Sequence, residues 1–151
     1  MIRGLLLLCS GIFLFTPTYS LAADGLIAMK SAHKVEETVA RLEKVLQDKD
    51  MTIFAKVDHA AGAKKVGKSL RPTQLLIFGN PQGGTPFMEC DQTVGIDLPL
   101  KALIWEDAEG QVWLGYNDPA YIAARHGVSD CPVAGKIKGA LENFAKAAAG
   151  S

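Results

Sequence analysis

The sequence predicts an α+β domain in which one layer of mostly antiparallel sheet packs against helices. Strand-like segments alternate with segments whose apolar residues recur at the 3.6-residue period of a helix. Two strand-like segments, 100–106 and 111–116, are joined by Ala108-Glu109-Gly110, which predicts a hairpin and excludes a purely parallel sheet. Helices that accompany such a sheet gather on one of its faces. The expected order is therefore β-α-β-β-β-β-α, with additional short helices.

The first half of the chain predicts two strands and two helices. A strand is expected over 26–30, and a helix over 34–47, where apolar residues follow helical spacing. A second strand is expected over 51–57, where residue types alternate. Asp58 then offers a side-chain cap for a short helix, which Gly67 ends.

The middle of the chain predicts a central strand and a turn into a helix. Residues 74–78 form a continuous apolar run, as in a strand buried on both faces. The following turn, 79–84, is rich in glycine and proline. Thr85 is a good N-cap and Pro86 would stand at the first helical position, where proline is favoured.

The last third predicts the hairpin and two capped helices. Asp118-Pro119 repeats the pattern of a cap followed by proline, and Gly127 would close that helix. Cys131-Pro132 introduces the final helix. Its apolar stripe consists of Val133, Ile137, Leu141, Phe144 and Ala148.

The N-terminus has the pattern of a cleaved secretory signal over residues 1–22. Arg3 supplies the positive start, residues 4–15 the apolar stretch, and Ser20-Leu21-Ala22 the small residues at the cleavage site. Cleavage after Ala23 is the second choice. The apolar run is too short for a membrane anchor, and the residue before Cys9 is too large for a lipoprotein signal. We therefore expect a periplasmic or secreted protein with no membrane attachment after cleavage, consisting of one domain over 26–148.

Charge and cysteine content restrict the possible partners. The chain carries 16 basic and 16 acidic residues without a basic stripe, so nucleic acid is not an expected partner.

Cleavage would leave two cysteines, Cys90 and Cys131, in an oxidising compartment. A disulfide between them is the first interpretation and would contribute roughly 4 kcal/mol by loop closure. Two free thiols or a thiolate metal site remain alternatives, whereas the spacing does not match a CxxC redox catalyst.

Several short motifs, in their order and spacing, identify a family resemblance. They are Asp58-His59, Leu70-Arg71-Pro72-Thr73, Phe78-Gly79-Asn80-Pro81, Thr85-Pro86-Phe87-Met88, Asp97-Leu98-Pro99-Leu100, Trp105-Glu106-Asp107 and Tyr116. Over about residues 28–144 the chain resembles the domain of unknown function 302 family. The resemblance implies a two-layer α+β fold with a TATA-binding-protein-like outline, and it supplies no catalytic residues and no role in DNA binding. Cys90 and Cys131 depart from the commoner family pattern.

The first candidate sites are two polar segments. Asp58-His59 could supply a general base, a ligand or a pH-sensitive group, although a helix start capped by Asp58 is the favoured interpretation. The turn from Asn80 through Gly83 and Gly84 to Thr85 could bind a small anion with backbone N–H groups. It lacks both the GK[ST] ending and the GxGxxG pattern, so no nucleotide cofactor is expected, and ordinary turn chemistry is the alternative.

Two further sets are weaker candidates. Cys90, Cys131, His126 and Met88 are soft-metal ligand types, but no pair has the close spacing of known sites, so no metal is assigned. Among the aromatic residues, Trp113 and Tyr116 should lie on opposite faces of their strand, and Tyr116 is included as a binding candidate. Core packing is the alternative for the whole aromatic set.

These observations favour a small, exported, non-enzymatic binding or accessory domain. Its surface would lie where Asp58 and His59 approach the Asn80–Thr85 turn, and its partner would be an unidentified small ligand or periplasmic protein. The alternative is a thiol-redox or soft-metal-handling factor that uses Cys90 and Cys131. An enzyme with His59 as its base is the third hypothesis, for which no substrate is apparent. The sequence leaves the oligomeric state open.

Overall fold

The computed structural model describes residues 23–150, so the expected signal segment 1–22 lies outside the described residues. The strands are β1 (Leu26–Lys30), β2 (Thr52–Asp58), β3 (Thr73–Gly79), β4 (Leu100–Glu106) and β5 (Val112–Asn117). The helices are α1 (Val35–Gln47), α2 (His59–Lys65), α3 (Pro81–Cys90), the 3₁₀ helix η1 (Gln92–Ile96), α4 (Pro119–Arg125) and α5 (Pro132–Ala149). Within 23–150, no helix combines the length and apolar character that crossing a bilayer requires.

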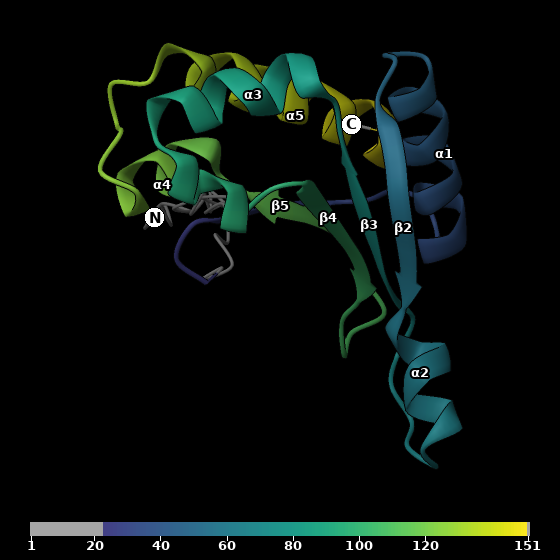
Figure 1. Ribbon diagram of the computed structural model, residues 1–151. Helices are drawn as coiled ribbons and strands as arrows, with labels where there is room; N and C mark the ends of the chain where they lie inside the picture. Colours follow the sequence, from purple (N-terminus) through teal and green to yellow (C-terminus); the bar gives the residue numbers. More distant parts are fainter. Residues whose placement is uncertain (1–22, 151) are drawn as a thin grey trace, which may run out of the picture.

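The five strands form one antiparallel sheet in the order β1-β5-β4-β3-β2 (Figure 1). The predicted α+β class and element order are confirmed. β1 pairs with β5, from Leu26 opposite Asn117 to Lys30 opposite Trp113, so the first and the last strand in sequence are neighbours in the sheet. The long helices α1 and α5 contact each other and cover the same sheet face. α2 projects from the far end of the β2–β3 pair (Figure 1).

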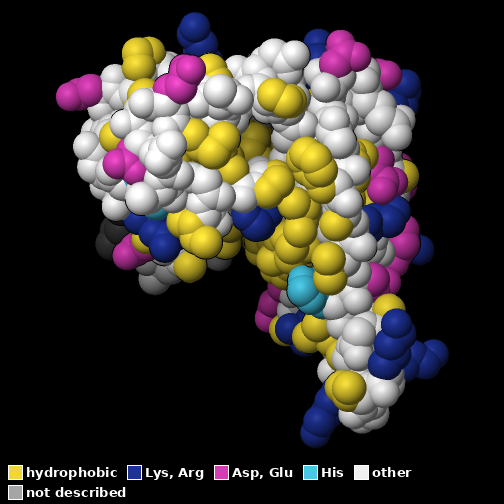
Figure 2. All heavy atoms as spheres, in the orientation of Figure 1, with side chains coloured by type: hydrophobic (Ala, Val, Ile, Leu, Met, Phe, Trp, Pro, Cys, Tyr) yellow, Lys and Arg dark blue, Asp and Glu magenta, His cyan; other side chains and the backbone are white. Residues whose placement is uncertain are grey.

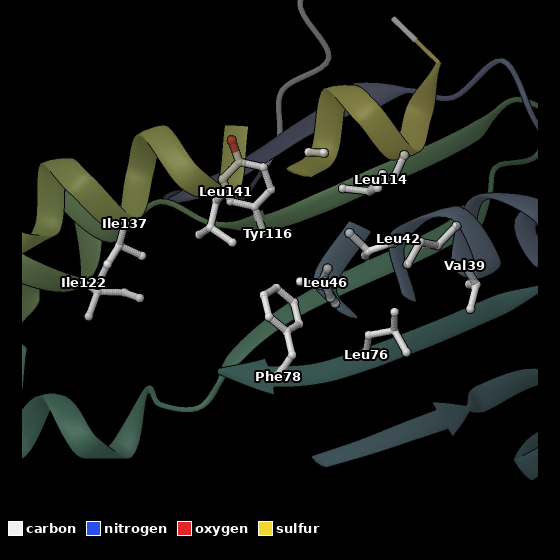
Figure 3. Packing of buried hydrophobic residues seen from close by; sticks show 14 of the residues in the cluster. Val39, Leu42, Leu46, Leu76, Phe78, Leu114, Tyr116, Ile122, Ile137 and Leu141 are labelled. Carbon is white, nitrogen blue, oxygen red and sulfur yellow. The ribbon is translucent and has the colours of Figure 1, made fainter. Parts of the chain in front are cut away.

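The core lies between the sheet and these two helices (Figure 3). Leu76 and Phe78 point from β3 toward Leu42 and Leu46 of α1, and all four side chains are almost completely buried. The spacing of the α1 residues, one turn apart, places them on the same helix face. Burying a side chain of this size stabilises a fold by about 1.5–3 kcal/mol. Consequently the apolar stripe predicted for the first helix packs against the sheet and attaches α1 to it.

One polar contact is embedded in this core. The Thr38 hydroxyl on α1 is fully buried and lies 2.7 Å from the Ser31 hydroxyl, which follows β1. Thr38 also donates a hydrogen bond to the carbonyl oxygen of Lys34, at 2.9 Å. The pair fixes the path of the chain between β1 and α1, because a buried hydroxyl without a partner would be destabilising.

Two of the three predicted caps are confirmed and the third is wrong. The Asp58 side chain accepts the Ala61 N–H at 2.8 Å and begins α2, and Asp118 accepts the Ala120 N–H at 2.9 Å and begins α4. However, α3 begins at Pro81 with Asn80 as its N-cap, so Thr85 and Pro86 stand inside it. Both Asn80-Pro81 and Thr85-Pro86 combine a capping residue with proline, and the structure uses the earlier pair.

Candidate functional site

A cavity of about 1100 Å³ lies between α1, α3, α5 and the end of the sheet. In Figure 2 the surface is hollowed in this region, and hydrophobic side chains surround the hollow. Its volume is slightly above the range for small-molecule sites, about 300–1,000 Å³. The larger apolar side chains that line it are Met51, Phe54, Met88, Leu98, Leu100, Val133, Ile137, Leu141 and Phe144.

The lining changes from apolar to polar toward solvent. Ile137 and Leu141 are buried, and Val45, Leu98, Leu100 and Val133 are half-buried. The polar lining residues are mostly exposed and therefore lie around the opening: Lys49, Gln82, Thr85, Lys136 and Asn143. Among the described residues that line the cavity there is no aspartate, glutamate, histidine or cysteine. This arrangement suits a molecule with an apolar body and a polar end.

A β-bulge directs one aromatic side chain into the cavity wall. The pairing of β2 with β3 is regular from Thr52 to Ile53, then shifts before Ala55. Phe54 stands at this irregularity, is 58% exposed, and lies beside Gly79. Bulges bend an edge strand and re-aim a side chain, and they are common next to binding sites. Phe54 is therefore an accessible apolar contact at the cavity wall.

The start of α3 forms another part of the wall. The Asn80 side chain accepts the Gly83 N–H at 2.9 Å, which fixes the first turn, and its amide nitrogen lies 3.1 Å from Met51 Sδ. Gly83, Gly84 and Thr85 follow along the wall. A Cβ atom at Gly84 would lie 3.6 Å from Leu98 Cδ1, an ordinary contact distance. The structure thus places the predicted Asn80–Thr85 segment at the cavity.

Asp58 and His59 do not belong to this site. In the antiparallel pairing of β2 with β3, Asp58 lies opposite Gln74, whereas Thr52 lies opposite Gly79. Asn80 follows Gly79, so six residue positions separate the two segments, about 20 Å along the strands. The expectation of one surface that contains both is wrong, because they occupy opposite ends of the same strand pair. Asp58 acts as the cap of α2, and His59 is exposed at its first position.

Tyr116 is a core residue and not part of the cavity lining. It is 3% exposed, and burial, followed by the charges of Glu142 and Asp118, raises the pKa of its phenol. Trp113 lies on the opposite face of β5, as predicted from the strand period. There its ring stacks with that of Trp105, with centroids 6.3 Å apart, and Lys30 Nζ lies 5.6 Å from the Trp113 centroid.

These tryptophans belong to the sheet face that α1 and α5 leave uncovered. Residues alternate along β3 and β4 between this face and the core, and its half-buried side chains include Leu75, Ile77, Leu103 and Trp105. Gly115 permits the packing of Trp105, since a Cβ there would lie 3.0 Å from the indole ring. In Figure 2 hydrophobic side chains gather over β3 and β4.

Cys90 and Cys131 lie at disulfide-bonding distance and join the helices beside the cavity. Cys90 ends α3 and Cys131 is the N-cap of α5, with their Cα atoms 6.1 Å apart. Cys90 is exposed and Cys131 is buried. This cross-link holds the two helical walls at one end, which agrees with the pairing predicted from the cysteine count.

His126 takes part in a hydrogen-bond network and not in a metal cluster. Its Nε2 lies 2.7 Å from Asp97 Oδ2, and its Nδ1 lies 2.8 Å from Thr93 Oγ1. Arg125 donates to the other Asp97 oxygen at 2.8 Å. The Thr93 hydroxyl and N–H lower the pKa of Asp91. Within residues 23–150 no three His, Cys, Asp or Glu side chains are grouped so that they could hold a metal ion. The network connects η1 with the end of α4.

The sequence did not identify several residues as part of a cavity wall. Val133 and Phe144 were expected in the core stripe of the last helix, and periodicity alone does not separate a core face from a cavity wall. One signal was available: Phe54 falls in the polar phase of its strand, between Thr52 and Lys56. Single exposed hydrophobic residues are common on protein surfaces, so this signal alone does not identify a cavity.

Comparisons with known proteins agree with this description. A family model described as "Domain of unknown function DUF302" matches residues 27–144. The crystal structure of an uncharacterized conserved DUF302 protein from Bacillus stearothermophilus superposes with a TM-score of 0.67 at 20% identity, covering 84% of this chain and 97% of that one.

Curated relatives from Brucella carry the name of a membrane channel. "Fluoride-specific ion channel FluC 1" from Brucella suis is 44% identical over 128 residues, which are 83% of this chain and 50% of that protein. The proteins named FluC 1 in Brucella abortus and FluC 2 in Brucella melitensis match at the same identity over 47% of their length. This chain therefore spans about half the length of these relatives. From the family match and the shared fold, we conclude that the chain belongs to the DUF302 family.

Proposed function

We propose that this protein is an exported, non-enzymatic domain that binds a small, mainly apolar molecule in the cavity between α1, α3 and α5. The observation that carries the proposal is the cavity itself, with about 1100 Å³ of volume and an apolar interior. Burial of an apolar ligand surface provides roughly 25 cal/mol per Å², so an interior of this kind is a source of affinity.

The side chains of the lining support binding rather than catalysis. General acid–base chemistry relies most often on histidine, aspartate, glutamate or cysteine, and the described lining has none of them. Lysines are present, but both are exposed, whereas a catalytic lysine is usually activated by burial. His59, the base considered from the sequence, lies at the far end of β2.

Export rests on two features of the chain. Residues 1–22 have the pattern of a signal segment, and the cysteines that remain after cleavage lie at bonding distance. The channel name of the Brucella relatives applies to proteins about twice as long, so we propose no transport activity for this chain.

The test is binding of a neutral fluorescent probe, N-phenyl-1-naphthylamine, to the purified mature protein. Ala140→Trp places an indole in the cavity, because Ala140 lines it from α5. Gly139→Trp is the matched control, since this neighbouring position is exposed and a Cβ there meets no atom within 4 Å. We expect saturable fluorescence enhancement in wild type and Gly139→Trp, and a loss of about tenfold in affinity in Ala140→Trp.

Two results would contradict the proposal. The first is the absence of saturable binding in folded wild-type protein. The second is equal affinity in wild type and Ala140→Trp, which would place the probe elsewhere, for example on the uncovered sheet face. Circular dichroism of both variants shows whether the fold is retained.

A thiol-redox role for Cys90 and Cys131 is the second candidate, favoured only by the exposure of Cys90. Alkylation of protein recovered from the periplasm, before and after addition of reductant, distinguishes the redox role from the binding role. A bond that resists reduction at the thiol potentials of that compartment would remove the redox role.

A further inference from the structure

All the charged residues of the described cavity lining are basic. Lys49, which follows α1, and Lys136 on α5 are the charged residues of the described lining, and both are exposed. The other exposed polar groups around them are the neutral side chains Gln82, Thr85 and Asn143. Thus two ammonium groups face the opening and no carboxylate of the described lining offsets them.

Neither lysine forms an ion pair or side-chain hydrogen bond within residues 23–150. By contrast, Lys44, Lys56, Lys138 and Lys146 all pair with nearby carboxylates at 2.6–3.1 Å. The lysines at the cavity are therefore available to a ligand without the loss of an existing salt bridge.

The start of α3 adds to this local positive potential. Its first turn lines the same cavity, and the N-terminal end of a helix carries a partial positive charge. The full sequence has no net charge, and residues 23–151, which would remain after the proposed cleavage, contain one more acidic than basic residue, or about −1. A preference for anions would consequently come from this site and not from the net charge.

We infer that the ligand is an anionic amphiphile, with an alkyl or aryl body in the apolar interior and a negatively charged head beside Lys49 and Lys136. This inference rests on the proposed function, since it names the chemical class that the same cavity accepts. Exposed ion pairs are individually weak, so a preference of about tenfold for the anion over a neutral analogue is expected. The preference falls as ionic strength rises, because salt screens exposed charges.

The test compares three amphiphiles with the same chain: decanoate, decanol and decyltrimethylammonium. Each displaces N-phenyl-1-naphthylamine from the mature protein below its micelle concentration. Decanoate is expected to act at about tenfold lower concentration than decanol, and the ammonium compound at the highest concentration. In Lys49→Met/Lys136→Met most of the preference for decanoate over decanol should be lost, since only the start of α3 then favours the anion. Lys64→Met/Lys65→Met removes the same charge from α2, at the far end of β2, and should keep the wild-type order.

The outcomes separate this inference from the proposed function. Equal displacement by all three compounds in wild type, or a preference for the cation, overturns the anion preference and leaves the apolar cavity as a binding site. If the anion preference is also lost in Lys64→Met/Lys65→Met, the preference arises from net charge and the inference is overturned. No binding of probe or amphiphile overturns both. Decanol affinity in each variant reports whether the cavity itself is intact.

Discussion

Removing the Cys90–Cys131 cross-link is predicted to destabilise the protein by about 4 kcal/mol. The two cysteines are 41 residues apart in sequence, and closing a loop of that length in the unfolded chain accounts for this magnitude. Domains of ordinary size have a total stability of about 5–15 kcal/mol, so the loss is a large fraction of it. The apparent Tm should fall by about 15 °C, because unfolding of a domain of this size has an entropy of roughly 0.27 kcal/mol per degree.

Urea unfolding followed by circular dichroism measures this effect in three samples. They are oxidised wild type, reduced wild type, and the Cys90→Ala/Cys131→Ala variant. The last two should agree, because they share an unfolded chain without the cross-link. Their m-value should exceed that of the oxidised protein, whose unfolded state is more compact. A difference below about 1 kcal/mol between oxidised and reduced protein would refute the loop-closure reasoning.

Three further changes test the local structure. Asn80→Ala removes the cap of α3 and should cost about 1 kcal/mol in urea unfolding, while an unchanged midpoint would reject the capping role. Thr38→Val should also cost about 1 kcal/mol, and Ser31→Ala/Thr38→Val should cost less than the sum of the single changes, since the two hydroxyls share one contact. Asp107→Asn should lower stability at pH 7, because the Trp113 N–H lowers the pKa of the Asp107 carboxyl. This contribution is present above the ordinary carboxyl pKa of about 4 and is lost as pH falls through the lowered folded value, so wild type and Asp107→Asn should converge in acid. A constant difference across that range would contradict it.

Features that depend on neighbouring residues could be predicted from the sequence. Asp58 and Asp118 act as caps where expected, and the strands around Gly110 form the predicted hairpin. Each follows from the chemistry of a few adjacent residues. The start of α3 was the exception, because two equally good cap-proline pairs stand five residues apart.

The candidate site could be predicted only in part. Asn80 and Thr85 line the cavity, but their distance from His59 depends on the antiparallel pairing of β2 and β3, which makes it large and which no local sequence pattern measures. The cavity is built from segments far apart in the chain, and its walls have the same residue types as a core. Phe144 illustrates this, because helical periodicity places it on the inner side of α5 without showing whether that side is filled.

Methyl NMR of the mature protein titrated with decanoate shows whether an apolar ligand occupies the cavity. Met51, Met88 and Ile137 report on the cavity, whereas Leu75 and Ile77 report on the uncovered sheet face. We predict saturable shifts in the first three methyl signals while the other two stay in place. Shifts confined to the sheet-face methyls, or the absence of saturable shifts in the cavity, would contradict the account.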